Sequence, residues 1–204
     1  ANHATTETVP LSQLGDHFTI QRTYTPPRTA PIQEWVPSKF GAPDFESVPT
    51  NYCYSYNTQV AIVEVDTDTG KVQVLKVVSA QDVGKVLNPQ VIEGQIHGGV
   101  MMGLGYALSE EFVIQDGINL TDSLRKCKIP MADQAPEIIP VILEIPHPTG
   151  PLGAKGMAEG TVMATTPAII NAIYDAVGVR ITSLPATPEK ILAELDGDAN
   201  NDAK

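Results

Sequence analysis

The sequence from Asn88 to Leu108 reads NPQVIEGQIHGGVMMGLGYAL, and its apolar residues recur at helical spacing. The proline directly after Asn88 suits the first helical position, so we expect one long helix over residues 89–108. Five glycines interrupt this helix, and each costs about 1 kcal/mol relative to alanine in a helix interior. Such a cost indicates that another backbone or a ligand approaches the helix closely.

Strand-forming runs precede and follow this helix. Residues 60–66 and 71–78 are rich in β-branched residues and flank the turn-forming Thr67-Asp-Thr-Gly70, which predicts a β-hairpin. Further strands are expected over residues 111–115 and 138–145, the first of them followed by a turn at Asp116-Gly117.

Two more helices are expected after the strands. The first covers residues 161–177, and the second covers residues 188–195 with Thr187 as its N-cap. On the first, the residues assigned to the buried side are Val162, Ala168, Ile169, Ala172, Ile173 and Ala176. The order of elements predicts an α+β domain with mixed sheets and packed helices.

The chain divides into three parts by composition. Residues 1–50 are rich in Pro and Thr, so we expect an extended N-terminal arm that packs on a partner, with Trp35 as an anchor. Residues 51–195 form the α+β domain. Residues 196–204 lack the apolar side chains needed to offset the entropy of ordering and are expected to be a disordered acidic tail.

Composition excludes several functions. The 24 acidic and 13 basic residues give a formal charge of -11, which disfavours nucleic acid as a partner. No apolar run approaches the roughly 18 residues of a membrane span, and no export signal is apparent, so a cytoplasmic location is expected. The two cysteines, Cys53 and Cys127, are too far apart in sequence for a CxxC metal site or a cluster ligand set.

The loop GAKGMAEG, residues 153–160, leads into a helix and is a candidate for the chemistry, but taken alone its pattern is ambiguous. It presents backbone N–H groups together with Lys155 and Glu159. On spacing alone, the favoured interpretation is that Glu159 merely complements the positive end of the following helix. A nucleotide loop is disfavoured, because the spacing matches neither the P-loop nor the dinucleotide-binding pattern.

Three separated motifs occur in the order found in the molybdenum hydroxylases. They are NPQVIEGQIHGGVMMGLGYALSEE at 88–111, KIPMADQAP at 128–136 and GAKGMAE at 153–159. With residues 18–31, which are similar to the segment that opens this half in the family, the resemblance covers roughly residues 15–195. The chain resembles the C-terminal part of the molybdopterin-binding subunit of the xanthine dehydrogenase/aldehyde oxidoreductase family.

The resemblance implies roles for particular residues. Glu159 would be the catalytic base, and burial would raise its pKa towards neutrality. Gln95 would hydrogen-bond the pterin or a ligand of the metal, although a solvated helix glutamine is about as common without the family. The residues implied to lie along the cofactor, chiefly through backbone groups, are Lys155, Gly156, Met157 and Ala158. No side chain of the chain is expected to ligate the metal directly.

The family also implies cofactors and partners. The cofactor would be molybdopterin with molybdenum, the cytosine dinucleotide form being one of the alternatives left open. Electrons would pass to [2Fe-2S] clusters and FAD in an iron-sulfur subunit and a FAD subunit. Because upstream cofactor-binding segments are missing from these residues, the chain would be active only with the other part of the molybdenum subunit. The small-molecule substrate would be an N-heteroaromatic compound or an aldehyde, and aromatic thioesters are also left open.

The sequence departs from the family at Ala158, where glycine is common before the glutamate. If this position needs a positive φ, the alanine is strained; otherwise it narrows the space beside the base. His97 is interpreted as structural, and His147 as a loop residue. Met101, Met102 and Met163 are interpreted as core fillers, and Ser109, Cys127 and His97 match no catalytic triad.

Two rival functions stay open. A non-catalytic scaffold domain would keep the fold but would need neither Gln95, Lys155 nor Glu159, and an absence of molybdenum from the purified complex would favour it. A stand-alone module for small anions at residues 153–160 would instead bind its ligand tightly in isolation.

Overall fold

The computed structural model describes residues 21, 23–27, 29 and 51–201. Its centre is a three-stranded sheet of order β1-β2-β5, built from β1 (Asn57–Val65), β2 (Val72–Asp82) and β5 (Glu137–Leu143). β1 and β2 pair antiparallel, whereas β2 and β5 pair parallel, so the sheet is mixed. Most of the expected N-terminal arm, including Trp35, lies outside the described residues.

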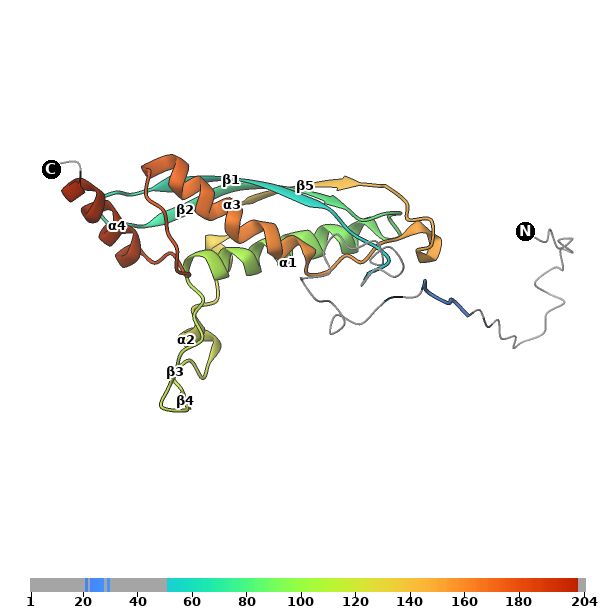
Figure 1. The fold of residues 1–204 in the computed structure, drawn as a ribbon, viewed down its shortest axis with the longest axis horizontal. Helices are drawn as coiled ribbons and strands as arrows, with labels where there is room; N and C mark the ends of the chain where they lie inside the picture. The colour runs from blue at the N-terminus through green and yellow to red at the C-terminus, as the bar shows by residue number, and fades with distance from the viewer. Residues whose placement is uncertain (1–20, 22, 28, 30–50, 202–204) are drawn as a thin grey trace, which may run out of the picture.

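Two long helices, α1 (Pro89–Leu108) and α3 (Gly160–Val177), run along the sheet (Figure 1). Apolar side chains from β2, α1 and α3 meet between these layers, among them Val77, Val100, Leu104, Ile169 and Ile173. Mixed sheet and packed helices confirm the predicted α+β class. The crossover from β2 through α1 to β5 gives the parallel pairing that a short hairpin connection cannot make.

The β1–β2 hairpin confirms the turn predicted after residue 66. The Asp66 carboxylate accepts hydrogen bonds from the N–H groups of Asp68 and Thr69, at 2.9 and 3.2 Å. Gly70 has a φ of +70°, and a Cβ at this position would collide with the carbonyl of Pro188. The turn therefore requires glycine at residue 70.

α1 has the bounds that the sequence predicts. The side chain of Asn88 accepts a hydrogen bond from the N–H of Val91 at 3.2 Å, which caps the helix. Pro89 then occupies the first turn, where its missing N–H costs nothing.

The later helices differ from expectation in two respects. The buried residues of α3 are Thr161, Thr165, Ile169 and Ile173, whereas Ala176, expected on the buried side, is exposed. The buried stripe includes threonines because α3 packs on glycines of α1. The last helix, α4 (Pro188–Asn201), continues past Leu195, the predicted end of this helix, into the segment expected to be the tail.

A projecting segment, residues 110–131, leaves the body of the fold between α1 and β5 (Figure 1). It contains β3 (Ile114–Gln115), β4 (Ile118–Asn119) and α2 (Leu124–Cys127), and the short helix η5 (Ala132–Gln134) follows it. The strand predicted over 111–115 is thus limited to its last two residues, and the predicted turn at Asp116-Gly117 joins it to β4.

Two surfaces of the described chain expose large apolar side chains. In the projecting segment these include Phe112, Ile118, Leu124 and Met131, each at least 64% exposed. On the sheet face opposite the helices they are Val60, Ile62, Leu75, Val141 and Leu143, which we call the open sheet face. Among the described helices, none combines the length and the apolar character required to cross a membrane.

Candidate functional site

The glycine-rich loop at residues 153–160 is fastened to the end of β2. Gly84 and Ala154 form an isolated antiparallel bridge. The N–H of Lys85 donates to the carbonyl of Gly153 at 2.8 Å, and the N–H of Lys155 donates to the carbonyl of Val83 at 3.0 Å. These backbone bonds fix the start of the loop, because strand-like pairing leaves it little freedom.

The side chain of Lys155 forms an ion pair with Asp82, the last residue of β2. Both side chains are buried, with exposed fractions of 6% and 2%. Burial by itself would raise the pKa of Asp82, but the hydrogen bonds from Lys155 and from the N–H of Gly84, with the charge of Lys155, hold that pKa below its usual value. The Lys155 ammonium group thus anchors the loop and is directed away from solvent.

Polar side chains at the beginning of β1 hold the other end of the loop. Ser55 donates to the carbonyl of Gly156 at 3.0 Å, and Asn57 donates to the carbonyl of Gly160 at 2.8 Å. Gln59 donates to the carbonyl of Thr161 at 2.7 Å. None of these three residues was predicted from the sequence, although Asn57 and Gln59 lie on one face of β1 and Ser55 precedes the strand with the same spacing of two residues.

Glu159 stands between these two anchored ends, at the N-cap position of α3. Its backbone is helical, its side chain makes no capping hydrogen bond, and the residue is exposed. The N-cap position is also the one that the purely structural interpretation expects, in which the charge of Glu159 complements the positive end of α3. Within the described residues Glu159 is exposed, so any desolvation of this carboxylate has to come from another surface.

Four of the five glycines of α1 fall into two groups. A Cβ on Gly103 would lie 2.9 Å from Cγ2 of Thr165 and closer still to its Cβ, and a Cβ on Gly99 would be 2.6 Å from Cβ of Thr161. These two glycines let α1 and α3 approach closely, as the sequence indicated. Gly94 and Gly98 differ, because a Cβ on either would meet no atom within 4 Å.

Gln95 and Glu159 lie at the same end of the pair of helices. The contacts of Gly99 with Thr161 and of Gly103 with Thr165 show that α1 and α3 run parallel in register. Gln95 is one turn before Gly99, and Glu159 is two residues before Thr161. Gln95, Gly94 and Gly98 are exposed, which leaves an open glycine surface on α1 at the end where Glu159 is presented.

The remaining loop residues predicted for the site are accessible to different extents. Gly156 and Ala158 are exposed, whereas Met157 is half-buried. Ala158 is not among the residues with a positive φ, so its side chain narrows the space beside Glu159 without backbone strain. The N–H of Lys155 is engaged by Val83, which leaves its carbonyl as the backbone group available to a ligand.

The two histidines make local contacts. His97 shares a hydrogen bond of 2.7 Å with the carbonyl of Glu93 one turn earlier, and His147 contacts Thr149 in the loop after β5. Across residues 51–201 and the few described residues before them, no group of three His, Cys, Asp or Glu side chains is placed to hold a metal ion.

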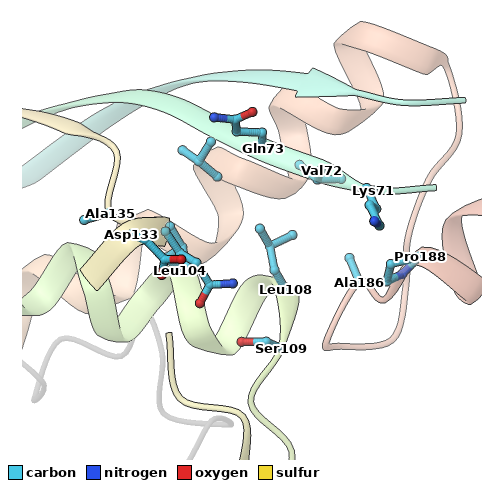
Figure 2. A pocket seen from close by; sticks show the side chains of 12 residues that line it. Lys71, Val72, Gln73, Leu104, Leu108, Ser109, Asp133, Ala135, Ala186 and Pro188 are labelled. Atoms are coloured by element: carbon cyan, nitrogen blue, oxygen red, sulfur yellow. The ribbon is translucent and has the colours of Figure 1, made fainter. Parts of the chain in front are cut away.

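A pocket of about 420 Å³ lies at the opposite end of α1 (Figure 2). Leu104 and Leu108 of α1, Lys71 at the start of β2 and Pro188 of α4 are among its lining residues. None of the residues predicted for the site contributes to it, so the pocket is separate from the Glu159 loop.

Comparisons with known proteins identify the family of the chain. The family model described as the molybdopterin cofactor-binding domain matches residues 20–136, more than half of the chain. The gamma subunit of the 6-hydroxypseudooxynicotine dehydrogenase complex of Paenarthrobacter nicotinovorans is 36% identical over 148 residues, 71% of this chain and 19% of that protein. The xanthine dehydrogenase molybdenum-binding subunit of Escherichia coli O157:H7 is 36% identical over 133 residues, 64% of this chain and 18% of that protein.

A solved structure is similar over the same share of the chain. The aldehyde oxidoreductase from Desulfovibrio desulfuricans ATCC 27774 superposes with a TM-score of 0.66 at 40% identity, covering 70% of this chain and 16% of that one. The chain thus spans less than a fifth of the length of these relatives. It belongs to the molybdopterin cofactor-binding domain family and is homologous to a small part of the molybdenum-binding subunits of aldehyde oxidoreductases and xanthine dehydrogenases.

Proposed function

We propose that this chain is part of the catalytic molybdenum subunit of a hydroxylase or dehydrogenase that oxidises an N-heteroaromatic compound or an aldehyde, with water as the oxygen source. The observation that supports this most is the presentation of Glu159. Its carboxylate is exposed and uncapped at the start of α3, while bonds to β1 and β2 hold the loop on both sides. A carboxylate free of structural contacts on a fixed backbone suits a general base.

The residues around Glu159 fit a molybdopterin cofactor. Gly94 and Gly98 each reduce helix stability by about 1 kcal/mol, and nothing in the described chain packs against them. Such positions suit the close approach of a planar cofactor to a helix backbone. Gln95 lies between them and offers an amide donor and acceptor, and Gly156, Met157 and Ala158 would face the cofactor from the loop. When bound, the cofactor supplies the metal and the two-electron acceptor for the oxidation.

Within this proposal, Glu159 accepts the proton of the water-derived oxygen as that oxygen attacks the substrate carbon. Covering by a second protein surface would exclude bulk water from Glu159 and from the reacting atoms beside it. The remainder of the molybdenum subunit would provide this cover.

The two apolar surfaces support the proposal that this chain is part of a larger molybdenum subunit. The projecting segment and the open sheet face each expose several large apolar side chains, as surfaces that contact other protein do. We assign both to contacts with the remainder of the molybdenum subunit, which in the relatives is more than four fifths of the protein. Electrons would leave through [2Fe-2S] clusters and FAD in partner chains.

The test uses the purified complete complex in which this chain occurs. Molybdenum and pterin are quantified, turnover is measured on a panel of N-heterocycles and aldehydes, and the product oxygen is traced from water labelled with ¹⁸O. The proposal expects molybdenum, turnover on at least one class and label in the product. Absence of molybdenum would instead favour a non-catalytic scaffold, and unlabelled product would exclude water as the oxygen source.

A further inference from the structure

We propose that Asn57 and Gln59 of β1 are positioning residues that fix the turn presenting Glu159 to its substrate. The inference rests on the proposed role of Glu159 as the base. It concerns two side chains that touch no reacting atom and act through the backbone carbonyls of Gly160 and Thr161.

The hydrogen bonds form a connected ladder between β1 and α3. Asn57 donates to the Gly160 carbonyl at 2.8 Å, directly after Glu159 in the chain, and Gln59 donates to the Thr161 carbonyl at 2.7 Å. The other end of the Gln59 amide accepts from the hydroxyl of Thr165 at 2.7 Å. Gln59 is therefore held at both ends, which fixes its side-chain orientation as well as the first turn of α3.

These polar residues are confined to the end of the sheet beneath Glu159. Further along the same face of β1, Ala61, Val63 and Val65 pack against the hydrophobic core. On the neighbouring strand, Asn57 and Gln59 pair with Gln81 and Ser79, which are buried and bonded to each other at 3.2 Å. A buried polar group costs more than an apolar one unless its bonds are satisfied, so apolar residues would be the simpler way to fill this space.

The ladder restricts the position of the first turn of α3 more tightly than apolar packing would. Apolar packing would allow the first turn of α3 to slide by fractions of an ångström, whereas hydrogen bonds to two successive carbonyls allow one arrangement. For a catalytic group, a misplacement of about 1 Å can cost about 100-fold in rate. We therefore expect loss of the ladder to lower kcat 10-fold to 100-fold and to change KM little, since the base contributes to the transition state only.

The test is a double-mutant cycle in the complete molybdenum-containing complex. Asn57→Leu and Gln59→Met approximate the side-chain shapes and remove the donors, alone and together, and each is combined with Glu159→Gln. Thr58→Val, on the opposite face of the same strand, is the matched control. Molybdenum content is measured for every variant, and amide hydrogen exchange of residues 157–165 reports whether the turn has loosened.

A positioning role predicts that the effects of the ladder variants and of Glu159→Gln on kcat are not additive. Once the ladder is removed, Glu159→Gln should cost far less than it costs in the wild-type complex, because a misplaced base contributes little. Exchange at residues 157–165 should quicken in the ladder variants, and Thr58→Val should behave as wild type. If the variant that carries both Asn57→Leu and Gln59→Met loses molybdenum, each single variant is instead combined with Glu159→Gln and the same comparison of kcat is made.

Two results separate the possible failures. In the first, Glu159→Gln lowers turnover by orders of magnitude, but the ladder variants leave kcat unchanged or lower it by the same factor with and without Glu159→Gln. The positioning role is then wrong, while the proposed function stands. If Glu159→Gln itself leaves turnover intact with molybdenum bound, the assigned base is wrong, and the positioning role fails with it.

Discussion

Alanine at Gly98 and at Gly103 should change the stability of the protein in opposite directions. Both glycines lie inside α1, so each substitution gains about 1 kcal/mol of helix propensity. A methyl group on Gly98 meets nothing within 4 Å, whereas one on Gly103 would lie 2.9 Å from Cγ2 of Thr165 and nearer to its Cβ. Overpacking typically costs 1–3 kcal/mol. We therefore expect Gly98→Ala to stabilise by about 1 kcal/mol and Gly103→Ala to destabilise by up to about 2 kcal/mol.

The informative assay compares stability with cofactor retention. The complete subunit is prepared without cofactor, and hydrogen exchange of α1 measures the opening free energy of each variant. In cofactor-loaded preparations, molybdenum per subunit is then measured. We expect Gly98→Ala to lose molybdenum in spite of its greater stability, because its methyl group occupies the surface assigned to the pterin. Full molybdenum content in Gly98→Ala would refute that assignment, and a stabilised Gly103→Ala would refute the packing account.

Three other predictions concern the anchor of the loop and the exposed surfaces. Lys155→Met and Asp82→Asn should each destabilise the cofactor-free protein by about 3–5 kcal/mol, since each leaves one partner buried without its ion pair. The double variant should lose less free energy of unfolding than the sum of the two single losses. Additive losses, measured by unfolding in denaturant, would contradict this. Because the pKa of Asp82 is lowered by folding, its stabilising contribution is complete above its usual pKa and is lost as the pH falls through the lowered value. The difference in unfolding free energy between wild type and Asp82→Asn should therefore shrink below about pH 4, and a constant difference down to pH 2 would show that the carboxylate is not stabilised in this way. Phe112→Asp in the projecting segment should impair assembly of the complete complex, as measured by gel filtration, while the exposed control Asp116→Asn should not. Normal assembly of the Phe112→Asp variant would show that this surface is not covered by the remainder of the molybdenum subunit.

Local sequence signals were sufficient for the elements that begin and end with strong caps or turns. α1 follows from Asn88, Pro89 and the helical spacing of its apolar residues, and the hairpin follows from its alternating strands and the turn at Gly70. The order of the three motifs was sufficient for the family, which the comparisons confirm.

Contacts between distant segments were not predictable from local signals. The ion pair of Asp82 with Lys155 joins residues 73 positions apart, and the bonds of Asn57 and Gln59 to α3 span more than 100 positions. The buried stripe of α3 was misassigned because threonines pack against glycines of α1, a preference that appears only when both helices are placed.

The most direct test of the account is Glu159→Gln in the complete complex, with molybdenum content and turnover measured on the same preparation. The substitution removes the base and preserves the size of the side chain, so the account predicts molybdenum content equal to wild type and a fall in kcat of several orders of magnitude. Turnover at the wild-type rate with molybdenum in place would contradict the central claim that Glu159 is the catalytic base.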